Sequence, residues 1–120
     1  MSKLILAKQR RQLIAQGRCT ASAFAAGQEP PDHWPVVKLF TPDAECTWLL
    51  SELDPEDPDL AFGLCDLGLG CAELGSVRVS EIESIRGVLG LKPERDRFFI
   101  PAQSLVAYAD IAREKGRIVA

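Results

Sequence analysis

The sequence predicts an α+β protein: an antiparallel meander sheet of about four to five strands, with an N-terminal helix, a short capped helix and a C-terminal helix. Apolar runs alternate with acidic or glycine-containing turns between residues 34 and 79, a pattern typical of consecutive short strands. The connections are shorter than the crossover that parallel strands need, so neighbouring strands must run antiparallel. Helical patterns precede this block, follow it directly and close the chain.

The length and composition of the chain are those of one globular domain, residues 1–120. Hydrophobic residues make up 47% of the sequence, and no apolar run approaches the roughly 20 residues that span a bilayer. The short apolar stretch near the N-terminus is followed by basic residues rather than by a cleavage site, so we expect no export signal. These features predict a soluble, cytoplasmic protein that binds no membrane.

The first 17 residues predict a basic amphipathic helix, because apolar positions at helical spacing alternate with basic and amide side chains. Gly17 suits the left-handed residue that follows many helices, so we expect the helix to end there. Residues 18–33 are rich in Ala, Gly and Pro and predict a loop, with at most one helical turn packed through Phe24.

Residues 34–101 predict the sheet and the short helix. Each expected strand is an apolar run bounded by turn residues. The four runs cover residues 34–40, 46–53, 60–67 and 73–79. Residues 54–59 carry two prolines and four carboxylates and predict a solvated turn between the second and third strands.

The short helix is predicted to begin at Ser80. Ser80 and Glu83 have the spacing of a capping box, in which each side chain accepts from the other's backbone N–H, a contribution of about 1 kcal/mol. We expect this helix to continue to Arg86 and to end at Gly87.

A short strand and a final helix complete the prediction. Residues 98–100 are apolar, follow Arg97 and precede a proline, so we expect a fifth, short strand over residues 97–100. Residues 102–116 carry an apolar stripe at helical spacing, with basic residues in the last turn and Gly116 at the end. This closing segment predicts a helix.

The sequence offers little sign of a metal or a cofactor. The four cysteines form no Cys-x-x-Cys pair and lie mostly in apolar runs, so we expect reduced thiols in the core and no zinc. His33 is the only imidazole, and no nucleophile motif surrounds it, which predicts a surface histidine rather than a catalytic one. We therefore expect no cofactor.

A group of carboxylates supplies the enzymatic alternative. Glu52 and Asp54 are two positions apart in a predicted strand and so point to one face, while Asp66 and Glu73 flank the next hairpin, where we expect them to lie close by. Four such carboxylates could hold Mg²⁺ or Mn²⁺ and position a water for phosphodiester hydrolysis. Acids at strand ends are also simply well solvated, and the sequence leaves both interpretations open.

Basic and aromatic residues supply the binding alternative. The net charge of −3 argues against general affinity for nucleic acid, yet basic residues gather near the N-terminus and again between residues 86 and 97. The planar guanidinium group of arginine can donate two parallel hydrogen bonds to a carboxylate or a phosphate. Phe98 and Phe99 are adjacent, so in a strand one of them faces outward. The candidate binding residues are Arg10, Arg11, Arg86, Arg95, Arg97 and Phe99.

The charged residues around the short helix have a second interpretation, an internal ion-pair network that fixes this helix to the sheet. The residues concerned are Glu81, Glu83, Arg86, Glu94, Arg95 and Asp96. On that interpretation Arg86 and Arg95 have structural partners rather than an external ligand.

A series of short motifs runs through the second to seventh predicted elements. They are F-T-P-D at residues 40–43, T-W and E-L-D within 47–54, F-G-L-C-D at 62–66, E-L-G at 73–75, S-E-I-E-S-I-R-G at 80–87 and G-L-K-P-E-R-D-R-F-F-I-P at 90–101. In this order they resemble a small bacterial family catalogued as domain of unknown function twenty-nine fifty-eight. The resemblance implies an accessory protein of plasmids and other mobile elements, some of whose members are labelled single-stranded DNA endonucleases, without an established activity.

Two functions follow from these patterns. The first is a non-enzymatic accessory or interaction module of a mobile element, which binds a protein partner or, as a second alternative, nucleic acid through the basic helix and the segment 95–99. The other is a metal-dependent hydrolase or nuclease that acts on single strands through the four carboxylates. The sequence fixes neither the partner nor the oligomeric state.

Overall fold

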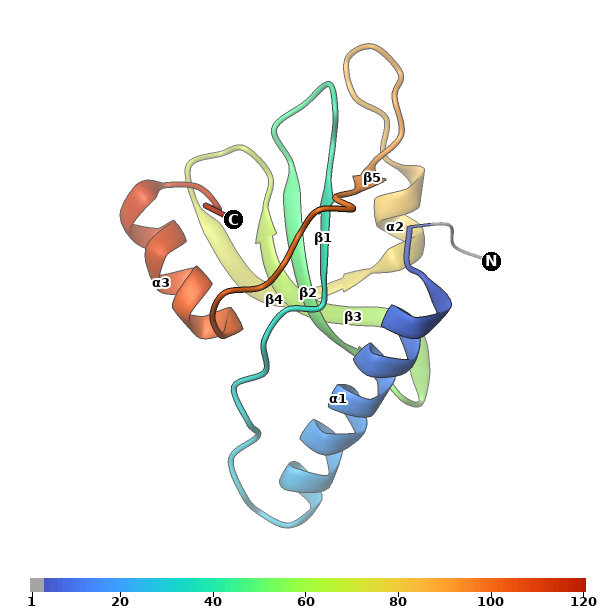
Figure 1. Cartoon of the computed structure of the whole chain (residues 1–120), viewed down its shortest axis with the longest axis vertical. Helices are drawn as coiled ribbons and strands as arrows, with labels where there is room; N and C mark the ends of the chain where they lie inside the picture. The colour runs from blue at the N-terminus through green and yellow to red at the C-terminus, as the bar shows by residue number, and fades with distance from the viewer. Residues whose placement is uncertain (1–3) are drawn as a thin grey trace.

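The computed structural model of the chain describes residues 4–120. Its centre is a five-stranded sheet in the order β4-β3-β2-β1-β5, and every pair of neighbouring strands is antiparallel. The elements in chain order are α1 (Ala7–Ala25), β1 (Val37–Phe40), β2 (Thr47–Asp54), β3 (Asp57–Asp66), β4 (Ala72–Arg78), α2 (Val79–Ser84), β5 (Glu94–Arg95) and α3 (Leu105–Lys115). The predicted α+β class and antiparallel meander are confirmed (Figure 1).

The alternation of side chains along β2 divides the interior into two cores. Trp48 and Leu50 point to the face that α1 and α2 cover, where they pack with Leu13 of α1. Leu49, between them, points to the opposite face and packs with Tyr108 of α3. The sheet is therefore covered by helices on both faces, and the central strand is buried on both sides.

Helix α1 is longer than predicted. Gly17 does not end it: the helix continues to Ala25, so the expected loop over residues 18–33 begins only after that. Gly17 is buried where α1 crosses β2, and a Cβ atom at this position would collide with the carbonyl oxygen of Leu53. The prediction was wrong because the glycine serves close packing of the helix on the sheet rather than a left-handed turn.

A bulge in β2 decides which residues reach each face. Leu50 pairs with Gly63, but Glu52 pairs with Phe62, so Ser51 is the extra residue. Because of this extra residue, Leu53 returns to the face of α1 and Glu52 turns to the face of α3. The bulge therefore sets the position of the Glu52 carboxylate.

The turn between β2 and β3 is shorter than predicted. Asp54 and Asp57 pair directly, so β3 begins at Asp57 and includes residues that the sequence assigned to a turn. The Oδ1 atom of Asp54 accepts a hydrogen bond from the backbone N–H of Glu56 at 2.9 Å. This local bond tightens the turn and leaves the following acidic residues available for strand pairing.

Helix α2 begins without the predicted capping box. Its N-cap is Arg78, and Ser80 lies inside the helix, which ends at Ser84 rather than Arg86. The hydroxyl of Ser80 donates to Oδ2 of Asp59 at 2.7 Å, and the backbone N–H of Ser80 donates to Oδ1 at 3.0 Å. An acid on β3 thus satisfies the start of the helix, a partner that local spacing does not reveal.

The bonds from Ser80 lower the pKa of Asp59, through the hydroxyl first and the backbone N–H second, and Arg78 adds to this effect. Since the folded-state pKa lies below the unfolded one, the contribution to stability is complete above the usual carboxyl pKa and is lost as the pH falls through the folded value. We expect Ser80→Ala to raise the pKa of Asp59 part of the way back to the ordinary carboxyl value, because the substitution removes the hydroxyl bond but keeps the backbone bond. An NMR titration of the carboxyl groups measures this change. Ser84→Ala, which removes a hydroxyl bonded to Glu81 O, should leave that pKa unchanged; an unchanged value in Ser80→Ala would contradict the assignment.

The fifth strand lies earlier in the chain than predicted. Strand β5 is Glu94–Arg95 and pairs with β1, while residues 97–100 form no strand. The reason is a turn at Asp96, whose Oδ1 accepts from the backbone N–H of Phe98 at 2.9 Å. Helix α3 matches the prediction: Ser104 caps its start, and Gly116 ends it with φ 77°.

The cysteines are all free thiols, but only two lie near the core. Cys46 and Cys65 are half-buried, and burial raises the pKa of the Cys65 thiol. Cys19 and Cys71 are exposed, so the prediction of core positions was wrong for these two. None of the helices in residues 4–120 is long and apolar enough to cross a membrane.

Candidate binding surface: a basic pocket beside an apolar loop

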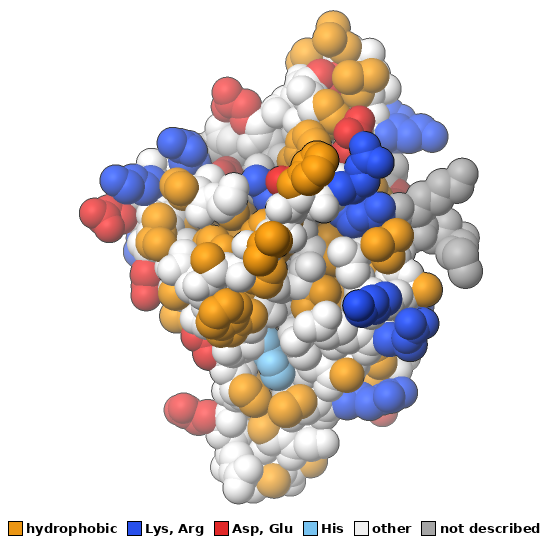
Figure 2. Space-filling view, in the orientation of Figure 1, with side chains coloured by type: hydrophobic (Ala, Val, Ile, Leu, Met, Phe, Trp, Pro, Cys, Tyr) orange, Lys and Arg blue, Asp and Glu red, His pale blue; other side chains and the backbone are white. Residues whose placement is uncertain are grey.

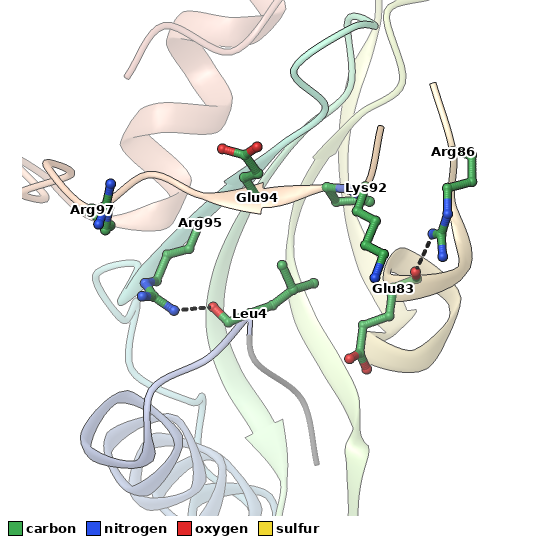
Figure 3. A pocket seen from close by; sticks show the side chains of 8 residues that line it. Leu4, Glu83, Arg86, Lys92, Glu94, Arg95 and Arg97 are labelled. Atoms are coloured by element: carbon green, nitrogen blue, oxygen red, sulfur yellow. Dashed lines mark hydrogen bonds between the residues drawn. The ribbon is translucent and has the colours of Figure 1, made fainter. Parts of the chain in front are cut away.

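A basic cavity lies between α2, the loop that follows it, β5 and the segment before α1. Its volume is about 510 Å³. The residues that line it are Leu4, Glu83, Arg86, Lys92, Pro93, Glu94, Arg95 and Arg97 (Figure 3). Four cations and two acids give this pocket, called the basic pocket below, a net positive charge in a chain whose overall charge is −3.

Two arginines of the basic pocket are held in place by backbone carbonyls. Arg86 donates from Nη1 to the carbonyl oxygens of Glu83 at 2.9 Å and Ile85 at 2.8 Å, which satisfies the end of α2. Arg95 donates from Nη1 to the carbonyl oxygen of Leu4 at 3.0 Å, across the pocket (Figure 3). The neutral carbonyl oxygens orient the Arg86 guanidinium group without neutralising its charge.

The remaining charges of the basic pocket are arranged around β5. Arg95 and Glu94 extend from opposite sides of this short strand, as their alternation requires (Figure 3). Lys92 and Arg97 flank the strand and are exposed. The lining of the pocket is thus dominated by cations, one just after α2 and three between residues 92 and 97.

An apolar loop, residues 87–91, rises beside the basic pocket at the top of the view in Figure 1. Val88 and Leu89 are 88% and 77% exposed, and Leu91 is also exposed. Exposed apolar side chains that adjoin polar rims are typical of interaction sites. The name apolar loop is kept for this segment below.

The apolar loop is folded around a carboxylate from the β1–β2 connection. Oδ2 of Asp43 accepts hydrogen bonds from the backbone N–H groups of Leu89 at 2.7 Å and Leu91 at 3.2 Å. Gly87 approaches so closely that a Cβ atom there would collide with this carboxylate. Gly90, with φ 79°, completes the turn and donates to the Gly87 carbonyl. The loop therefore presents its apolar side chains outward from a bonded backbone.

Helix α1 extends the basic surface. Arg10 and Arg11 are exposed on it, as predicted from the sequence. Figure 2 shows Lys and Arg side chains gathered along the side of the molecule that carries α1 and β5. The basic pocket and the N-terminal half of α1 thus share one side of the protein.

The aromatic candidate occupies a different position from the one expected. Phe99 is half-buried against the core of α3, and its ring centroid lies 6.4 Å from that of Tyr108. Phe98 is 88% exposed, next to Arg97. The outward-facing aromatic residue at this edge is therefore Phe98, and Phe99 is a packing residue.

The charged residues around α2 follow the ion-pair interpretation only in part. Asp96 pairs with Lys38 of β1 at 3.5 Å and so anchors the end of β5. Arg86 bonds to carbonyl oxygens rather than to the acids of the predicted network. The positive charge of Arg86 is thus available at the pocket.

The four predicted catalytic carboxylates do not come together. In the β2–β3 register Asp66 lies opposite Thr47, seven residues from Asp54 and so about 23 Å away along the strand. Asp66 is buried and accepts from the backbone N–H groups of Gly68 and Ile118, while Glu73 is exposed on β4. Across residues 4–120, no group of three acids, histidines or cysteines could hold a metal ion.

His33 is not the surface residue that the sequence predicts. Its side chain is 14% exposed and lies against Thr20 of α1 and Glu52 of β2. Sequence reasoning missed this neighbourhood because it placed Thr20 in a loop. It also missed Lys92 and Asp43 as site residues. The Pro-Asp turn and the glycines at 87 and 90 do signal an unusual backbone at the two segments that meet where Asp43 contacts the apolar loop.

Comparison with known proteins places the chain in a family without assigning an activity. A family model described as a protein of unknown function (DUF2958) matches residues 4–119. No curated protein and no solved structure matches the chain. The family match confirms the resemblance read from the sequence motifs and covers every helix and strand.

Proposed function

Since the chain belongs to the DUF2958 family, whose description names no activity, we propose a function from its surface: an interaction module that binds an acidic, apolar segment of a protein partner. The observation that carries this proposal is that a positively charged pocket and an exposed apolar loop lie next to each other. The basic pocket supplies cations held by backbone carbonyls, and the apolar loop beside it exposes Val88 and Leu89. The resemblance to plasmid and mobile-element accessory proteins suits such a role.

The two surfaces together favour a protein partner over nucleic acid. Phosphate groups are bound by cations and hydrogen-bond donors, and aliphatic side chains such as Val88 and Leu89 add nothing to such a contact. A partner segment that carries both carboxylates and large apolar residues would use the whole surface, because cations meet its acids and the apolar loop meets its apolar side chains. Arg10 and Arg11 add long-range attraction for the same acidic segment.

Selection from a displayed library of random peptides, with the wild-type protein as bait, tests this proposal. We expect the enriched sequences to combine Asp or Glu with Leu, Ile or Phe. Fluorescence anisotropy of one labelled, selected peptide should show binding that weakens about tenfold in Arg86→Ala/Arg97→Ala, which is about 1.4 kcal/mol, and similarly in Leu89→Ser. Added salt should weaken the wild-type binding.

The matched control removes two exposed cations elsewhere. Lys115 and Arg117 lie in and after the last turn of α3, away from the basic pocket, so Lys115→Ala/Arg117→Ala should bind the peptide as the wild type does. Enrichment of sequences without acids would overturn the proposal. Tighter binding of a short poly-thymidine strand than of any selected peptide would instead assign the surface to single-stranded nucleic acid.

A further inference from the structure

A second cavity, of about 320 Å³, lies over the sheet between the end of α1 and the start of α3. It shares no lining residue with the basic pocket. Its walls are mostly apolar: Phe24 of α1, two prolines of the segment after α1, Phe62 and Leu74 of the sheet, and Leu105 and Val106 of α3. This volume lies at the small end of the range for small-molecule sites.

A cluster of three polar side chains lies in the wall of this cavity. The Thr20 hydroxyl donates to Oε2 of Glu52 at 2.6 Å, and Nε2 of His33 lies 3.2 Å from the same hydroxyl. Because the single hydroxyl proton goes to Glu52, the ring nitrogen is the donor in the second bond. His33 Nε2 and Glu52 Oε2 are 3.7 Å apart, so the three groups form one closed cluster.

The cluster is held in place by the strand bulge and by hydrogen bonds to α1 and α3. The bulge at Ser51 turns Glu52 toward this face, and Thr20 fixes its carboxylate. The segment that carries His33 is bound to the start of α3: the His33 carbonyl accepts from Leu105 N–H at 2.9 Å, and Oδ1 of Asp32 accepts from Val106 N–H at 3.2 Å. The cavity is therefore formed before any ligand arrives.

The chemistry of the walls identifies a class of ligand. Glu52 places a carboxylate, only 16% exposed, at the edge of an apolar space, where a cation would find a strong partner. Phe62 lies opposite Glu52 in the strand register, and Phe24 faces the same cavity from α1. Aromatic side chains that line the same cavity as a carboxylate suit an organic ammonium group.

We propose that this cavity binds a small organic amine, with the ammonium group at Glu52 and the apolar body against Phe24, Phe62 and Val106. The inference is independent of the peptide surface, since the two sites have different residues. Hexylamine is the probe, and 1-hexanol and hexanoate are matched probes of the same length with a neutral and a negative end. Titrations are followed by amide NMR shifts and by calorimetry.

The expected result is a saturable shift of amides in residues 31–33, 51–52 and 105–106 with hexylamine. Hexanol should bind about tenfold more weakly, because it lacks the charge, and hexanoate should not bind. Equal binding of the amine and the alcohol, no saturable binding of the amine, or shifts elsewhere in the protein would overturn the proposal.

Variants separate the charge from the cavity. Glu52→Gln keeps the shape and an acceptor for Thr20, and it should weaken hexylamine binding about tenfold while hexanol binding stays the same. Phe24→Ala removes an exposed side chain and should weaken both probes, whether or not Glu52→Gln folds. The matched controls are Glu94→Gln and Phe98→Ala, which change a carboxylate and an exposed aromatic residue outside the cavity and should alter neither affinity. Unchanged amine binding in both Glu52→Gln and Phe24→Ala would refute the site.

Discussion

Replacing Gly17 with alanine is expected to destabilise the protein by about 3 kcal/mol, although alanine is the better helix former by about 1 kcal/mol. The added Cβ would collide with the Leu53 carbonyl, and its next neighbours are the Leu53 carbonyl carbon and Pro55 Cδ. Backbone atoms of a central strand cannot move aside as a flexible side chain can. Helix α1 would have to lift from β2, which loosens the packing of Leu13 in the core.

Thermal and urea unfolding measure this effect, and a loss of 3 kcal/mol corresponds to a fall in Tm of about 10 °C for a chain of this size. Gly75→Ala is the matched control, because nothing lies within 4 Å of a Cβ at that strand position and the backbone is not left-handed. The control should change stability by less than about 0.5 kcal/mol. Equal stability of Gly17→Ala and the wild type would mean that α1 does not pack on β2 at this distance.

Asp43→Ala should release the apolar loop. The carboxylate is the acceptor for the backbone N–H groups of Leu89 and Leu91, and these lose their partner in the variant. Hydrogen bonds to a charged group contribute about 2 kcal/mol to stability. We take a value near the lower end of their range because the substitution also removes the buried Oδ1 atom of Asp43, which has no hydrogen-bond partner. We expect amide hydrogen exchange in residues 87–91 to accelerate about 30-fold and peptide binding to weaken.

Asp110→Ala serves as the control for removing an aspartate, since Asp110 is exposed and pairs with Arg113 on its own helix. Exchange in residues 87–91 should be unchanged in this variant. If the loop amides of Asp43→Ala exchanged at the wild-type rate, Asp43 would not hold the loop, and the proposed rigid presentation of Val88 and Leu89 would fail.

The fold could be predicted from sequence wherever the information is local. Strands β1 to β4 and helix α3 follow from alternation, turn residues and caps, so they lie within a few residues of their expected positions. The errors arise where a distant segment decides the structure. Gly17 stays helical because β2 lies beneath it, and Ser80 fails to cap because Asp59 of β3 takes its bonds.

The candidate sites show the same division. Arg86, Arg95 and Arg97 share one pocket as the charge pattern suggested, because they lie close together in the chain. The cluster around His33 could not be predicted, since its members are brought together by a helix extension and a strand bulge that leave no local signal. The distance of Asp66 from Asp54 could not be read from the sequence for a related reason: its hydrogen-bond partner Ile118 lies 52 residues further along the chain.

The proposed function requires that the basic pocket and the apolar loop together form the partner-binding surface. This requirement can be tested by mapping amide chemical-shift changes during titration with a selected acidic, apolar peptide. We expect changes concentrated in α2, residues 87–93 and β5, with smaller changes at Arg10 and Arg11. Changes confined to α3 or to the edge of β4, with none around Arg86 and Leu89, would contradict it.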